Sequence, residues 1–155
     1  MWQRHGVVLK LEKKYWVKKG EGKRRRRSKD MSSFTTPLIV TILPDGRRGK
    51  LFHQFTYHIG TKCSKDFITV PVGFVTDFAS SPFFVWSFIP PWGRYSKAAV
   101  IHDYIYQTKI RTRKEADDIF LEAMLVLGVP AWKAKLMYWG VRTFGWIPWL
   151  LRKEN

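Results

Sequence analysis

The two segments that decide the fold read Ile101-His102-Asp103-Tyr104-Ile105-Tyr106 and Glu115-Ala116-Asp117-Asp118-Ile119-Phe120. Residues that start and stop helices flank them, which predicts one helix over about 96–108 and a second over about 113–127. Residues 109–111 form the whole link between these helices. A link this short predicts that the two helices pack as an antiparallel hairpin.

The predicted helix ends rest on particular side chains. Ser96 is expected to cap the first helix, because a serine oxygen can accept a bond from an unpaired backbone N–H. Thr112 and Glu115 have the spacing of a capping box at the start of the second helix. Gly128 is expected to end that helix.

The hairpin would bring together side chains suited to acid–base chemistry. His102 and Tyr106 are four residues apart and so share one helix face. The antiparallel partner can place Asp117 opposite His102, where its carboxylate would fix the tautomer and stabilise the imidazolium. We therefore take His102, Asp117 and Tyr106 as candidate catalytic residues. A carboxylate at Nδ1 and an open cleft at Nε2 would favour an enzyme, whereas full burial of both nitrogens would favour a structural pair.

The order H-D-x-x-Y followed by A-D-x-x-F resembles the secreted and parvoviral phospholipases A2. The resemblance implies that His102 is the base, that Asp103 binds calcium and that Asp117 orients the histidine. It also implies that Tyr106 donates a hydrogen bond to the Asp117 carboxylate.

Three further motifs resemble a phage and prophage family, number 1353 in the domain-of-unknown-function series. They are Val70–Pro82, Ile89–Tyr95 and Ala99–Tyr104, within a likeness that runs from about Ser32 to Trp146. This resemblance implies a viral or prophage origin and carries no established activity.

Strand patterns precede the helices. Apolar and β-branched runs lie at about 38–43, 51–59, 67–70 and 74–76, and Gly and Pro separate them. A third helix is predicted over about 130–144. The fold class is therefore α+β, with a small antiparallel sheet over about 37–76 followed by three helices.

The third helix is amphipathic in the sequence. We expect Trp132, Leu136, Trp139 and Thr143 to face the helix pair, because they follow helical spacing. On the same grounds we expect Lys133, Lys135 and Arg142 to lie on the opposite side.

Charge is concentrated at the amino terminus. The net charge of the chain is +16, and residues 1–30 contain 12 Lys/Arg against 3 Asp/Glu. This predicts that residues 1–30 are a basic segment that is disordered when free, with residues 31–155 forming one domain. The segment is either an extension without a role of its own or an arm that binds nucleic acid or a membrane. Arg24, Arg25, Arg26 and Arg27 are candidate anion-binding residues. Nucleic acid, an anionic phospholipid surface, a cell-wall polymer or phage structural proteins are the expected partners.

Two further candidate sites can each be interpreted in two ways. Asp77 follows a predicted strand and either joins Asp103 as a calcium ligand or caps the next turn. Trp146 and Trp149, in an apolar segment with a basic end, either lie at a membrane interface or pack back onto the domain.

The cysteine count and the distribution of apolar residues bear on where the protein is located. Cys63 is the single cysteine, so no disulfide can form within the chain. No apolar run is long enough to cross a bilayer, and the amino terminus lacks the pattern of a signal peptide. We expect the protein in the cytoplasm of the bacterial host or associated with the virion.

Three functions compete on these grounds. The first is a calcium-assisted hydrolase of phospholipase A2 type with His102 as general base. The second is a non-enzymatic virion-associated or host-interaction protein that binds an anionic partner. In the third, His102 and Asp117 form a hydrogen-bonded pair that only joins two helices.

Overall fold

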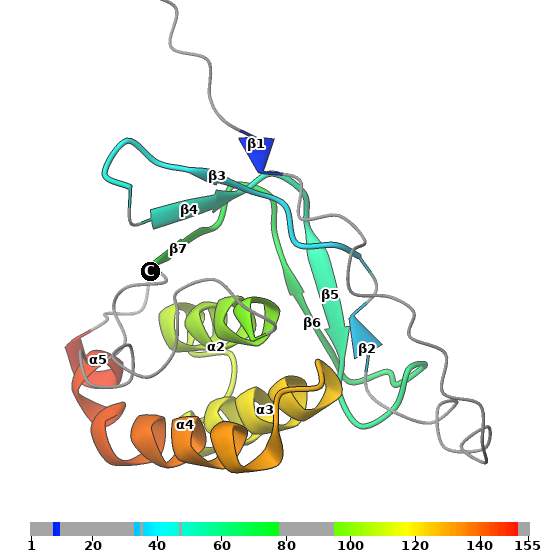
Figure 1. Cartoon of the computed structure of the whole chain (residues 1–155), viewed down its shortest axis with the longest axis vertical. Helices are drawn as coiled ribbons and strands as arrows, with labels where there is room; N and C mark the ends of the chain where they lie inside the picture. Colours follow the sequence, from blue (N-terminus) through cyan, green and yellow to red (C-terminus); the bar gives the residue numbers. More distant parts are fainter. Residues whose placement is uncertain (1–7, 10–32, 35, 47, 78–94, 152–155) are drawn as a thin grey trace, which may run out of the picture.

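The structure, a computed structural model, describes residues 8–9, 33–34, 36–46, 48–77 and 95–151. Two small sheets lie on one side of this part of the chain and a layer of helices on the other (Figure 1). The α+β class predicted from the sequence is confirmed.

The first sheet has the strand order β1-β3-β4-β7, and all its pairs are antiparallel. Its strands are β1 (Val8–Leu9), β3 (Val40–Ile42), β4 (Arg48–Leu51) and β7 (Val75–Asp77). The turn between β3 and β4 uses Gly46 at a φ of 68°, a left-handed conformation that glycine adopts without steric cost. The Asp45 carboxylate accepts a bond from the Arg48 backbone N–H and so closes this turn.

The second sheet has the order β2-β5-β6 and is also antiparallel. Its strands are β2 (Ser33–Phe34), β5 (Phe55–His58) and β6 (Phe67–Val70). Alternate residues of β5 are buried, and Phe55 and Tyr57 are among the most buried side chains in the described chain. This alternation is expected of a strand with one face on the core.

Four helices follow within the described residues: α2 (Ser96–Thr108), α3 (Arg113–Val126), α4 (Ala131–Phe144) and α5 (Trp146–Leu151). Helix α2 lies between the sheets and the other helices and contacts β6 and β7 (Figure 1). Helices α2 and α3 form the predicted hairpin. Lys109 adopts a φ of 52° after α2 and turns the chain between them.

The core is continuous from the sheets through α2 to α3. Val100, Ile101 and Ile105 of α2 are fully buried, as are Val70 of β6 and Met124 of α3. Burial of aliphatic side chains of this size stabilises the fold by about 1.5–3 kcal/mol each. Helix α2 is therefore fixed on both sides, and its polar residues have a rigid support.

The structure differs from the sequence prediction in two local respects. The strands divide between two sheets, and β4 adds a strand that its polar sequence Arg-Gly-Lys-Leu did not reveal. Ser96 is not the cap of α2. Tyr95 occupies the N-cap position, makes no side-chain cap bond there, and Ser96 is the first helical residue.

The predicted orientation of the third helix is wrong. Helix α4 turns Ala134, Met137 and Val141 into the core, whereas Trp132 and Trp139 are 71% and 64% exposed. Both faces of this helix are apolar, so helical spacing alone could not decide between them. The inward face has the smaller side chains, which let α4 approach α3 closely.

Residues 1–30 lie outside the described residues except for β1, which pairs with β3. The division into a basic extension and one domain over 31–155 stays a prediction.

The capping box of α3 is present as predicted. Thr112 accepts from the backbone N–H of Glu115, and the Glu115 carboxylate accepts from the backbone N–H of Thr112. Replacing Thr112 with Ala should lower the free energy of unfolding by about 1 kcal/mol, because the backbone N–H of Glu115 loses its side-chain acceptor. Denaturant unfolding measures this change.

Two variants control the experiment. Thr112→Ser keeps the hydroxyl and should stay near wild type. Thr143→Ala removes an exposed threonine of α4 and should change the free energy of unfolding by less than about 0.5 kcal/mol. An equal loss in the Thr112→Ala and Thr143→Ala variants would contradict the assigned role of Thr112.

Candidate functional site

The hairpin places His102 of α2 against Asp117 of α3, as the sequence predicts. The distance from His102 Nε2 to Asp117 Oδ1 is 2.9 Å. The Asp117 side chain is fully buried, and the His102 side chain is 11% exposed. The ring centroids of Tyr106 and Phe120 lie 4.1 and 4.8 Å from the centroid of the imidazole, so both rings pack against it.

The partners of Asp117 determine the tautomer of His102. Burial by itself raises the pKa of the Asp117 carboxyl, but hydrogen bonds from His102, Tyr106 and Arg142 outweigh burial and lower it below its ordinary value of 3.8. Asp117 is therefore ionised near neutral pH and can only accept hydrogen bonds. It follows that Nε2 carries the proton and that the lone pair of a neutral His102 is on Nδ1.

Tyr106 supports the same carboxylate. Its hydroxyl donates to Asp117 Oδ1 at 2.7 Å, in the arrangement that the phospholipase A2 resemblance implies. Burial, followed by the hydrogen bond to Asp117, raises the pKa of the Tyr106 phenol well above its ordinary value. The phenol is thus neutral and remains a donor.

Gly145 makes room for this hydroxyl. A Cβ atom at position 145 would lie 2.6 Å from the Tyr106 oxygen, closer than two such atoms can approach. Trp149 of α5 covers the Tyr106 ring edge-on, with ring centres 5.0 Å apart. The end of α4 and the start of α5 therefore shape the phenol side of the site.

Two arginines that sequence reasoning did not assign to the site complete the network. Arg142 of α4 donates to Asp117 Oδ2 at 2.9 Å, and Arg113 of α3 lies 3.6 Å from the same oxygen. Arg113 also donates to the backbone carbonyl of Arg142 at 3.1 Å, which joins α3 to α4. The prediction that Arg142 lies away from the helix pair is therefore wrong.

A sequence signal existed for one of these arginines. Arg113 and Asp117 are four residues apart, the spacing at which side chains meet on a helix. No local spacing relates Arg142 to Asp117, because 25 residues separate them along the chain. Only the packing of α4 on α3 brings this pair together.

Asp103 faces a different neighbour from His102. Its Oδ2 accepts a hydrogen bond from the Thr76 hydroxyl of β7 at 2.7 Å, and Thr76 is fully buried. Adjacent residues of a helix point about 100° apart, so Asp103 faces the sheet while His102 faces α3. The backbone of Asp77 is in β7 next to Thr76, and its side chain lies outside the described residues.

The remaining candidate residues are the arginines of the amino-terminal segment and the two carboxyl-terminal tryptophans. Arg24–Arg27 lie outside the described residues. Trp149 packs onto Tyr106, whereas Trp146 is 52% exposed. A membrane interface at these tryptophans stays a prediction.

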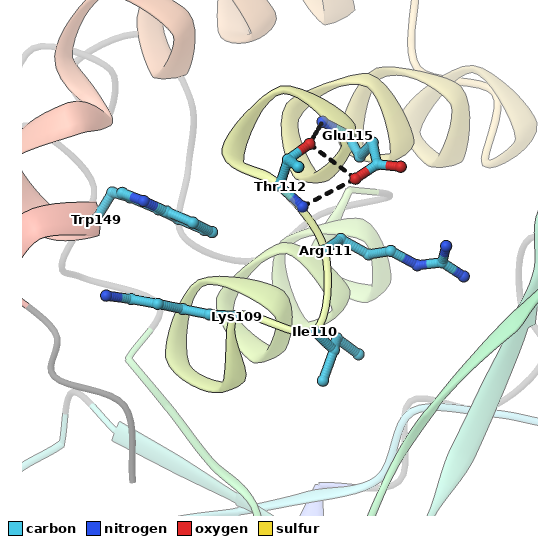
Figure 2. A pocket seen from close by; sticks show the side chains of 6 residues that line it. All are labelled: Lys109, Ile110, Arg111, Thr112, Glu115 and Trp149. Carbon is cyan, nitrogen blue, oxygen red and sulfur yellow. Dashed lines mark hydrogen bonds between the residues drawn. The ribbon is translucent and has the colours of Figure 1, made fainter.

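An open pocket of about 580 Å³ lies beside the site, at the turn between α2 and α3. Figure 2 shows its lining, which consists of Lys109, Ile110, Arg111, Thr112, Glu115 and Trp149. Lys109 Nζ lies 5.5 Å from the centre of the Trp149 ring, in cation–π contact. Since His102 and Asp117 are absent from this lining, the pocket is a neighbour of the site rather than the site itself.

The described residues were compared with the requirements of a metal site and of a membrane-spanning helix. Nowhere among them do three His, Cys, Asp or Glu side chains gather in a way that could hold a metal ion. None of the described helices is both long enough and apolar enough to span a bilayer.

Fold and site together define a small α+β protein with a buried His–Asp–Tyr–Arg network between helices. The chain belongs to the family described as "Protein of unknown function (DUF1353)", whose model matches residues 50–141. All three motifs that carried the resemblance lie in this range, so the predicted family is confirmed.

Two curated relatives come from Sinorhizobium fredii (strain NBRC 101917 / NGR234). Uncharacterized protein y4jT is 50% identical over 78 residues, which cover 49% of this chain and 23% of that protein. Uncharacterized protein y4iH is 42% identical over 125 residues, which cover 76% of this chain and 49% of that protein. The chain thus spans less than half the length of these relatives. No solved structure matches the chain.

Asp117 links stability to pH. Its pKa in the folded chain is below 3.8, so the ionised carboxylate stabilises the fold above about pH 3.8, and this contribution is lost as pH falls through the lowered pKa. Asp117→Asn should lower the free energy of unfolding near neutral pH by about 1–3 kcal/mol, because buried donors lose a charged acceptor. The difference in the free energy of unfolding between wild type and Asp117→Asn should become smaller at acid pH.

Urea unfolding at about pH 7 and about pH 3 measures this difference. The control is Asp118→Asn, which removes a partly exposed carboxylate that pairs with Lys114 and should cost less than about 1 kcal/mol. A gap between wild type and Asp117→Asn that stays constant with pH would show that the carboxylate is not held ionised.

Proposed function

We propose that the protein is a hydrolase of phospholipase A2 type that cleaves carboxylic esters of phospholipids, with His102 as its general base. One observation carries the proposal: buried, ionised Asp117 accepts from Nε2, which leaves the basic lone pair on Nδ1. The sequence-based expectation had the two nitrogens in the opposite roles. The chemistry is the same, because either nitrogen can be the base when the other is held as a donor.

In the proposed reaction a water molecule attacks the ester carbonyl carbon. Nδ1 of His102 takes a proton from this water as its oxygen bonds to carbon, and the resulting imidazolium is stabilised by Asp117. The tetrahedral intermediate then expels the alcohol, and the imidazolium returns the proton to the leaving oxygen. Fatty acid and lysophospholipid are the products, and His102 is again neutral.

Tyr106 acts in this scheme as a positioning residue. Its hydroxyl holds Asp117 Oδ1 from the side of α2, at the oxygen that also accepts from the imidazole. Fixing this oxygen fixes the ring, and a ring held in one orientation loses less entropy on reaching the transition state.

Calcium is the cation proposed for this activity. Asp103 offers a carboxylate oxygen, the ligand type that calcium prefers, and its hydrogen bond from Thr76 fixes the carboxylate on the sheet side of α2. Calcium needs six to eight oxygens in typical sites, and Asp103 with Thr76 supplies a small part of such a set. When bound, calcium would polarise the ester carbonyl.

A specific observation favours a second candidate function. Arg142 and Arg113 both lie against Asp117, so the negative charge that would support an imidazolium is already balanced by guanidinium groups. Under this second proposal the network only joins α2, α3 and α4. The protein would then be a non-enzymatic virion-associated or host-interaction protein that binds an anionic partner.

His102→Ala and His102→Asn distinguish these candidates. If His102 is the base, either change should lower the rate of hydrolysis by a factor on the order of a hundred to ten thousand. The assay is fatty-acid release from anionic phospholipid vesicles with calcium, beside a thermal melt of each variant. His53→Ala, which removes an exposed histidine of the β4–β5 connection, is the matched control and should keep full activity.

Folded wild-type protein that binds calcium-loaded vesicles and releases no fatty acid would reject the hydrolase. A loss of stability in the His102 variants, without any activity to lose, would favour the structural network instead.

Asp103→Asn tests the proposed calcium ligand. The change replaces a carboxylate with a neutral amide, so hydrolysis should lose its dependence on added calcium. Rates measured across a calcium titration and with chelator report this. A variant with the same calcium dependence as wild type would remove Asp103 from the proposed site.

A further inference from the structure

We propose that the outer face of α4 and α5 docks onto an anionic phospholipid bilayer. This α4–α5 face consists of the exposed apolar side chains of the two helices: Trp132, Leu136, Trp139, Phe144, Trp146, Ile147, Leu150 and Leu151. The proposal deepens the proposed function, on which it rests for the ester that is cleaved. Binding to a bilayer is measured separately from hydrolysis.

The exposed apolar residues of α4 are ordered along one side of the helix rather than scattered. Trp132, Leu136 and Trp139 are spaced by four and three residues, so they form one stripe along α4. Helix α5 follows directly and has no buried residue, and its Leu151 is 77% exposed. Contiguous exposed apolar surface of this kind marks sites of protein or membrane contact in soluble proteins.

The position of the face leaves it accessible. Helix α4 packs on α3 through Ala134, Met137 and Val141, so its stripe points away from the core. Figure 1 shows α4 and α5 on the side of the helical layer away from the second sheet. A flat surface could approach the stripe without displacing any described element.

Charge selects an anionic bilayer as the occupant. Between Gly128 and Lys153 the chain has four Lys or Arg residues besides Arg142, which pairs with Asp117, and no Asp or Glu. Lys133 and Lys135 flank the stripe on α4, one on each side. Tryptophans in an apolar stripe with lysines beside it suit the boundary between lipid headgroups and acyl chains. Each such cation near an anionic leaflet adds electrostatic attraction to the bilayer.

The same charges disfavour a second copy of the chain. Pairing of two α4 stripes about a twofold axis would bring the Lys133 and Lys135 side chains of both copies near one another with no acidic residue on either helix. Like charges in a closed interface are costly. An anionic bilayer satisfies the apolar and the basic parts of the face together.

The face also adjoins the candidate site. Trp149 of α5 packs on the ring of Tyr106, and the Tyr106 hydroxyl donates a hydrogen bond to Asp117. A bilayer held against α5 would therefore lie one side chain away from the network that positions His102.

Vesicle flotation of the full chain tests the proposal. The vesicles are phosphatidylcholine with or without phosphatidylglycerol, at about 0.15 M ionic strength and again at about 1 M to screen attraction to the basic residues 1–30. The triple change Trp132→Ser, Leu136→Ser and Trp139→Ser should weaken binding to anionic vesicles by a factor on the order of ten or more, because inserted apolar area is lost.

The matched control changes three apolar residues of the sheet side that are each more than half exposed, Phe52→Ser, Phe67→Ser and Val72→Ser. It should bind like wild type. Lys135→Glu should weaken binding to anionic vesicles and leave binding to neutral vesicles unchanged. A thermal melt of each variant confirms that it is folded.

Three outcomes would overturn the proposal: no binding of wild type to anionic vesicles, equal binding of wild type and the stripe variant, or self-association that the stripe variant abolishes in the absence of vesicle binding. Hydrolysis of a soluble short-chain ester without vesicle binding would reject this proposal and keep the proposed function. Vesicle binding through the stripe without hydrolysis would reject the proposed hydrolase and keep the proposal that this face docks onto a bilayer.

Discussion

The buried carboxylate of Asp117 is the constraint on which the helical layer depends. An ionised carboxylate removed from water costs several kcal/mol unless charged or polar donors surround it. Four side chains meet this requirement here, namely His102 and Tyr106 from α2, Arg113 from α3 and Arg142 from α4. The network therefore fixes the positions of three helices relative to one another, and any change in their packing would leave a buried charge unpaired.

The same network joins a candidate chemical centre to the surface of the protein. On one side, Asp117 holds the Nε2 proton of His102. On the other, Arg142 ties it to α4, whose outer stripe carries Trp132 and Trp139. Structural and catalytic roles of such a network are compatible, because a base needs a rigid support. Two guanidinium groups around one carboxylate add rigidity but reduce the net negative charge beside the imidazole.

Membership of the family assigns no activity, but it shows which parts of the fold and of the network the family model includes. The match over residues 50–141 includes β5, β6, β7, α2 and α3 and most of α4, so it contains every residue of the network except Arg142. The relatives y4jT and y4iH are more than twice as long as the matched regions, so in those proteins this fold is one part of a larger chain.

Sequence by itself determined the local structure and the first contacts of the site. The Thr112–Glu115 capping box and the short link at 109–111 predict the α2–α3 hairpin, and the spacing of His102 and Tyr106 puts both on the face of α2 that meets Asp117. These are short-range relations, in which helix geometry converts sequence separation directly into distance. The tertiary structure decided which face of α4 is buried, since both faces are apolar and only packing volume distinguishes them. That choice brought Arg142 to Asp117 and left Trp132 and Trp139 in solvent, because one helix cannot turn both faces toward the same core.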